Sequence, residues 1–189
     1  MIACRFIFVL LISLPIFSSV ALAQRSWQPS PEMSRLAQAL AGDWSNSEVM
    51  ERSAFFPSGG ERHGSSKCQL DTGGTTLICQ GESDGTAGML HHLIVMWWDD
   101  RAKLYGFFAC FKENGDSGCK VRGTAHWEGD VFLNDYTEEV DGKPTKFRDS
   151  FVEITPKSHT LIAAMQLRDG RLRTLITTKS TRRSISLGK

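Results

Sequence analysis

The sequence lacks an excess of charge of either sign. Its 22 lysine and arginine residues are balanced by 21 aspartate and glutamate residues, which gives a formal net charge of +1. It also has no run of basic residues with aromatic residues interleaved. Proteins that bind nucleic acid or anionic membrane surfaces depend on such clusters. We therefore expect neither as a partner.

Long apolar runs are missing after the first 20 residues. Arg5, the interrupted apolar run at 6–20, and the small residues Ala21 and Ala23 form the pattern of a bacterial export signal. The run is too short for a spanning helix, although an uncleaved anchor is an alternative. Residues 1–23 are thus expected to be a signal peptide, with no membrane span after cleavage and a periplasmic or secreted product.

Cleavage would leave 189 − 23 = 166 residues, which suits one domain with a full core. We expect a flexible arm at 24–30, one domain at 31–182 and a disordered tail at 183–189.

Catalytic signatures are missing as well. The sequence contains no G-x-S-x-G elbow, no phosphate-binding loop and no H-E-x-x-H motif. Its histidines have no metal-ligand spacing, and the adjacent His91 and His92 would point to opposite faces of a strand. We therefore expect no metal, no cofactor and no catalytic residue, and a binding protein rather than an enzyme.

Four cysteines follow the signal segment: Cys68, Cys79, Cys110 and Cys119. An even number in an oxidising compartment favours disulfides. Zinc is the alternative, but neither spacing forms a short C-x-x-C knuckle. A turn centred on 73–74 places the first two cysteines opposite each other, and a turn centred on 114–115 does the same for the last two.

A helix is predicted at 31–41. Ser30 and Pro31 provide a cap and a proline at the first helical position, and apolar residues at helical spacing follow. After Gly42 the helical pattern gives way to short runs rich in β-branched and aromatic residues, separated by turn dipeptides. These runs predict strands near 43–52, 62–70, 75–82, 89–98, 103–112, 117–127, 130–139, 144–154, 160–168 and 171–181.

The expected fold is all-β: a single antiparallel up-and-down barrel of about ten strands, preceded by a short N-terminal helix. Closure removes the exposed edges of such a meander. A barrel of this size tends to enclose a cavity rather than fill itself with side chains.

The helix, the G-x-W motif at Gly42 and Trp44, and the meander after it resemble the calycin group of lipocalin-like barrels. More narrowly, WWDDRAKLYGFF, the Asp-Gly hairpins after it and an arginine-bearing last strand resemble an uncharacterised bacterial domain-of-unknown-function family with a lipocalin-like β-barrel. The resemblance covers residues 36–182. It implies this fold and the binding of small apolar molecules.

The resemblance also implies that Trp44 closes one end of the barrel beneath a cation of the last strand, which is Lys179 or Arg182. Nitrobindin-like haem barrels are a neighbouring group. Their glycine-rich segment after the tryptophan is replaced here by Ser-Asn-Ser at 45–47, which argues against haem.

Two-residue turns at 128–129, 141–142 and 169–170 would fix the pairing of the later strands. A tight loop at 156–159 would likewise place Gln166 opposite Asp149. The two-residue turns place Asp135 between Arg122 and Arg148, which indicates a solvated face. The opposite face would carry aromatic side chains and one polar row. We interpret this row as the polar anchor of a ligand site, with two glycines leaving room beside it: Gly106, Gly123, Asn134, Tyr136, Asp149, Gln166 and Arg173. The alternative is an internal hydrogen-bond network without a ligand.

The hairpin at 93–111 is apolar on both faces, whereas a barrel wall needs only one apolar face. The helix is expected to cover the outer face, and a second subunit is the alternative. The protein would accordingly be a monomer or a homodimer through this hairpin.

Three functions remain. The favoured one is an exported carrier or sensor of a small, mainly apolar or amphipathic ligand. The others are a barrel that binds a protein through the outer face of 93–111, and a cofactor-free calycin-type enzyme. An Asp149 that titrates near neutral pH would favour the enzyme.

Overall fold

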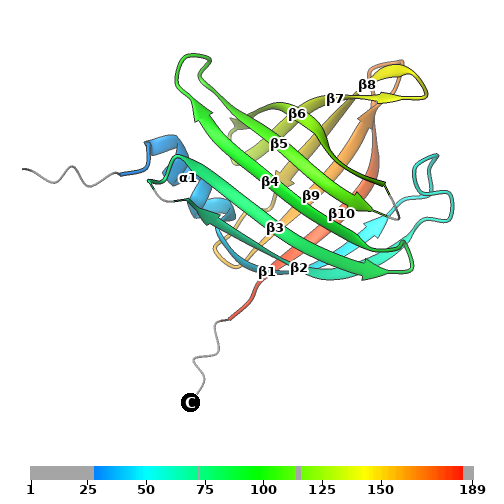
Figure 1. Ribbon diagram of the computed structural model, residues 1–189, viewed down its shortest axis with the longest axis horizontal. Helices are drawn as coiled ribbons and strands as arrows, with labels where there is room; N and C mark the ends of the chain where they lie inside the picture. Colours follow the sequence, from blue (N-terminus) through cyan, green and yellow to red (C-terminus); the bar gives the residue numbers. More distant parts are fainter. Residues whose placement is uncertain (1–27, 72, 114–115, 185–189) are drawn as a thin grey trace, which may run out of the picture.

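A closed barrel of ten antiparallel strands forms the molecule, and one helix precedes it (Figure 1). The computed structural model describes residues 28–71, 73–113 and 116–184. The helix is α1 (Pro31–Leu40), and the strands are β1 (Gly42–Met50), β2 (Gly60–Leu70), β3 (Thr76–Gly85), β4 (Leu90–Asp99), β5 (Leu104–Glu113), β6 (Asp116–Glu128), β7 (Val131–Val140), β8 (Lys143–Val152), β9 (Ser158–Gln166) and β10 (Leu172–Arg182).

Each strand pairs with its neighbours in sequence, and β1 also pairs with β10 to close the barrel. The predicted fold class is therefore confirmed. The predicted signal peptide at 1–23, residues 24–27 of the predicted arm, the turn residues 114–115 and residues 185–189 of the predicted tail lie outside the described residues. No helix in the described part of the chain has the length and apolar character needed to cross a membrane.

Both predicted disulfides are confirmed. Cys68 faces Cys79 across β2 and β3, and the two are bonded. Cys110 is bonded to Cys119 beside a register shift between β5 and β6. Two disulfides in one small domain are typical of an oxidising, exported environment.

The turn at 141–142 has the predicted two-residue form. Asp141 and Gly142 both have positive φ, at 50° and 72°, as the usual tight hairpin turn requires. Asp135 consequently faces Arg148, and Arg148 Nε lies 2.7 Å from Asp135 Oδ1. Asn134 faces Asp149, as predicted.

The turn between β6 and β7 differs from the prediction. Glu128 pairs with Val131, so the turn is centred on 129–130 instead of 128–129. The predicted pairs Arg122–Asp135 and Gly123–Asn134 are wrong for this reason. Asp135 faces Thr124.

The two turns that flank β9 also differ from the prediction. In the first, the Thr155 amide donates to the Ser158 carbonyl, so the turn lies earlier in the chain than predicted, and Asp149 faces Ala163 instead of Gln166. In the next turn the Leu167 amide donates to the Arg171 carbonyl, so Gln166 faces Leu172 instead of Arg173. A slip of one residue moves a side chain to the other face of a strand, and these turns therefore decide what reaches the interior.

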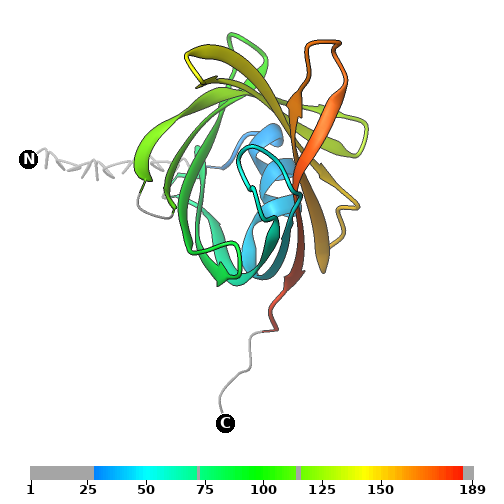
Figure 2. The ribbon, with the colours of Figure 1, turned by 90° about the vertical axis from the view of Figure 1, so that its right-hand side faces the viewer.

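Helix α1 closes one end of the barrel, where Figure 2 shows it behind the ring of strands. Ser30 Oγ accepts a hydrogen bond from the Met33 amide and caps the helix. Met33 and Leu36 belong to one core cluster with the interior residues Leu77 and Met96. The prediction that the helix covers the outer face of 93–111 is therefore wrong, because its apolar stripe is buried inside the end of the barrel.

The outer face of that hairpin carries Trp97, which is 36% exposed. The neighbouring Trp98 packs edge-on against buried Tyr105, and Phe107 is also buried. Of the two faces of the hairpin, the one with Trp98 and Phe107 thus faces inward.

Candidate functional site

An internal cavity of about 200 Å³ lies along one side of the barrel. Its lining comes from α1 and every strand except β6, because the opposite side is filled by the cluster around Tyr105, Phe107 and Phe132. Most of the lining is apolar. The polar and charged members are Asn46, Glu48, Arg62, Ser66, His92, Tyr136, Asp149, His159, Thr178 and Ser180.

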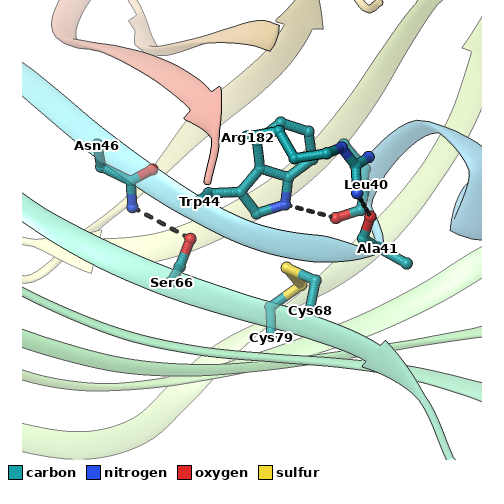
Figure 3. The surroundings of a disulfide bond; sticks show 8 residues. All are labelled: Leu40, Ala41, Trp44, Asn46, Ser66, Cys68, Cys79 and Arg182. Carbon is teal, nitrogen blue, oxygen red and sulfur yellow. Dashed lines mark hydrogen bonds between the residues drawn. A yellow bond between two sulfur atoms is a disulfide. The ribbon is translucent and has the colours of Figure 1, made fainter. Parts of the chain in front are cut away.

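Trp44 forms the floor of the cavity at the helix end (Figure 3). Its indole is fully buried, and Nε1 donates to the Leu40 carbonyl at 2.9 Å. The Arg182 guanidinium lies 4.4 Å from the ring centroid and donates to the Ala41 carbonyl. A side chain at Gly42 would overlap Arg182. The glycine leaves space for the arginine, and the arginine covers the tryptophan ring. Lys179, the other candidate cation, is exposed and does not take part.

Arg62 lies inside the barrel near the opposite end. It is 1% exposed, and its guanidinium lies 2.9 Å from a Glu48 oxygen and 2.5 Å from a Glu113 oxygen. Glu48 is on the neighbouring strand β1, but Glu113 is on β5, which is not adjacent to β2. The arginine therefore connects two separate parts of the wall.

Asp149 and Tyr136 form a second polar group in the lining. The Tyr136 hydroxyl donates to Asp149 Oδ1 at 3.3 Å. Burial raises the pKa of Asp149 to about 7, although the hydrogen bond from Tyr136 acts in the opposite direction and lowers it. Burial also raises the pKa of Tyr136 well above its usual range. A carboxyl that titrates near neutral pH in an apolar cavity can act as a general base.

Two histidines of the lining are neutral at pH 7. Burial, together with the positive charge of nearby Arg62 or Arg182, lowers the pKa of His92 and of His159 to about 4. His159 Nδ1 and Asn46 Oδ1 are buried without a hydrogen-bond partner in the described structure. Such atoms are uncommon in native proteins, where buried polar groups are generally paired.

The structure places some residues of the predicted polar row at the cavity and others away from it. Tyr136 and Asp149 line the cavity, and Asn134 is buried beside Asp149. Gln166 is exposed and donates to the Gly170 carbonyl. Arg173 is also exposed and donates to the Arg52 carbonyl, so both lie away from the cavity.

The two glycines of the predicted site do not leave space for a ligand. A side chain at Gly106 would overlap the indole of Trp97, which covers this glycine. A side chain at Gly123 would overlap the ring of Phe107, so the space beside this glycine is occupied by that ring. Gly106 faces Thr124 instead of lying beside Gly123.

Sequence reasoning missed Arg62, Glu48 and Asn46. For Asn46 and Glu48, the available signal was the alternation of side chains between the two faces of β1. Residues 44, 46, 48 and 50 are all buried, and the residues between them are not. The nine-residue connection at 51–59 has no tight-turn form that would place Arg62 beside Glu48.

Asp149 should make the stability of the protein depend on pH. Its pKa is about 7 in the folded state against 3.8 for an ordinary aspartate, so the folded state retains a proton that the unfolded chain releases. Stability should fall as pH rises from about 4 to about 7 and stay lower above that. We expect Asp149→Asn to raise the free energy of unfolding by about 2 kcal/mol at pH 8 and to change it little at pH 4.

Urea unfolding at these two pH values measures this effect. Asp135→Asn is the control, because Asp135 is half-exposed on the outer face, and it should shift stability by less than about 1 kcal/mol. An equal gain from Asp149→Asn at both pH values would contradict the assignment.

No protein-family model and no curated protein sequence matches the chain. Several solved structures share its fold. Rv2717c from M. tuberculosis matches with a TM-score of 0.57 at 12% identity, over 83% of this chain and 100% of that protein. The S-type phycobiliprotein lyase CPES from Guillardia theta matches with a TM-score of 0.56 at 8% identity, over 80% of this chain and 92% of that protein. At these identities the likeness establishes the fold, and the chain has a lipocalin-like barrel.

Proposed function

We propose that the protein is an exported carrier or sensor that binds a small, mainly apolar molecule inside its barrel. The observation that supports this most directly is the cavity of about 200 Å³ with a mostly apolar lining. An apolar cavity of about 150 Å³ in another protein binds benzene. The cavity therefore suits a molecule with one or two rings or a short alkyl chain.

The polar atoms support the same function. A barrel stabilised only by its own interior would pair its buried polar groups. Asn46 and His159 line the cavity, and Asn46 Oδ1 and His159 Nδ1 have no partner among the described residues. A few converging polar groups in an apolar pocket are typical of ligand sites.

Filling the cavity should abolish binding. Ala163 lines it, whereas the preceding residue on β9, Ile162, points to the outer face. We expect Ala163→Phe to weaken binding of n-propylbenzene at least about tenfold, because the ring occupies its space. Ile162→Phe should change binding less than about twofold.

Calorimetric titration of the three proteins provides the measurement. Binding of n-propylbenzene that survives Ala163→Phe unchanged would place its site elsewhere and refute the interior cavity as the binding site.

A further inference from the structure

The charges in the cavity wall limit what a polar ligand group can be. Among the described residues that line the cavity, Arg62 is the one cation, and Glu48 and Asp149 are carboxyl groups. Arg62 is already paired with Glu48 and Glu113. A ligand carboxylate would therefore meet no available cation and would lie near buried carboxyl groups, at a high desolvation cost.

The histidines do not change this balance. Burial keeps the pKa of His92 and His159 near 4, so neither is positively charged at neutral pH. Arg182 is engaged with the Trp44 ring and with two backbone carbonyls. The basic groups that surround the cavity thus offer little to an anion.

Hydrogen-bond acceptors are available instead. Asp149 accepts a hydrogen bond from Tyr136 at one oxygen, and a carboxylate can accept several. Asn46 is 7% exposed and lines the cavity. Its amide nitrogen donates to Ser66 Oγ, which leaves the Asn46 carbonyl oxygen unpaired.

Aromatic faces complete the surroundings. Tyr136 and Phe151 line the cavity together with Asp149, and Tyr136 stacks on Phe147. Rings of this kind attract a cation to their faces. A carboxylate, an unpaired carbonyl oxygen and aromatic rings are the groups that stabilise an ammonium ion away from water.

We infer that the cavity takes a small apolar molecule that carries one amine, and that the ammonium group pairs with Asp149. This inference rests on the proposed function and assigns the chemical class of its ligand. Arg173, which the sequence placed in the site, lies outside it and cannot supply a cation for an acidic ligand.

Three probes that share a phenylethyl group test the inference: 2-phenylethylamine, n-propylbenzene and 3-phenylpropionate. At about pH 8, where most of the Asp149 carboxyl is ionised, we expect the amine to bind at least about tenfold more tightly than n-propylbenzene. The carboxylate should bind most weakly. Asp149→Asn should remove the advantage of the amine and leave n-propylbenzene within about twofold.

Asp135→Asn is the matched control, because it removes a carboxylate from the outer face beside the same strand pair. It should change each of the three affinities by less than about twofold. If n-propylbenzene binds but the amine gains nothing over it, or if Asp149→Asn leaves that gain intact, the inference is overturned while the proposed function stands. If none of the three binds to the wild type, the proposed function fails and the inference fails with it.

Discussion

Replacing Arg62 with methionine should lower the free energy of unfolding by about 3–5 kcal/mol. The guanidinium is buried between Glu48 and Glu113. Methionine retains much of the volume but no charge, so Glu48, which is 5% exposed, would remain as a buried carboxylate without its partner. An uncompensated buried charge is among the most destabilising changes that one substitution can cause.

A second variant separates charge from packing. Arg62→Met combined with Glu48→Gln should recover most of the loss, because no buried charge is left unpaired. Arg148→Met is the control, since its pair with Asp135 is half-exposed and should contribute less than about 1 kcal/mol. Urea unfolding of the four proteins measures these differences. A double variant no more stable than Arg62→Met would show that the loss comes from packing.

Trp44→Ala is expected to cost about 3–5 kcal/mol of unfolding free energy. The indole is fully buried, packs edge-on against His159 with ring centroids 4.5 Å apart, and holds Arg182 over its face. Its removal would enlarge the cavity at the floor and leave the Leu40 carbonyl without its donor. Both effects act in the same direction.

Trp97→Ala is the matched control. Trp97 is partly exposed on the outer face, where its ring covers Gly106, and its loss should cost about 1 kcal/mol. Thermal and urea unfolding compare the two variants. A Trp44→Ala protein as stable as Trp97→Ala would mean that the floor of the barrel does not depend on this residue.

The fold was predictable because its signals are local. Alternating residues, turn dipeptides and a capped helix each act over a few positions, and they placed the helix, the strands and both disulfides. The pair Cys68–Cys79 depends only on the turn between them, which has the expected register.

The interior was harder to predict because it depends on loop lengths. A glycine marks a turn but does not say which residues are central to it, and Gly129 is the first of its turn instead of the second. The turn before β9 lies earlier in the chain than predicted and the turn after it is longer, so the prediction placed Gln166 and Arg173 on the wrong face. Tyr136 and Asp149 were placed correctly because the intervening turn has two residues.

Arg62 shows a different limit. Its partners lie 14 and 51 residues away in sequence. Glu48 is separated from it by a nine-residue connection without a tight-turn signal, and Glu113 is on a strand that is not adjacent to β2. A charged residue on a strand is usually solvated. Arg62 points inward only because the barrel is closed. The pairing of the charges inside the cavity therefore depends on the tertiary structure.

The closure of the barrel between β1 and β10 also bears on how the chain folds. The contact of Arg182 with the Ala41 carbonyl joins residues 141 positions apart in sequence. Contacts between residues so far apart in sequence form slowly, because closing the long loop costs chain entropy before the contact contributes any stability. Hairpins such as β2–β3 can pair early, but the first strand lacks one of its two partners until the last strand has been synthesised. The ring of strands therefore closes only after synthesis reaches its C-terminal strand.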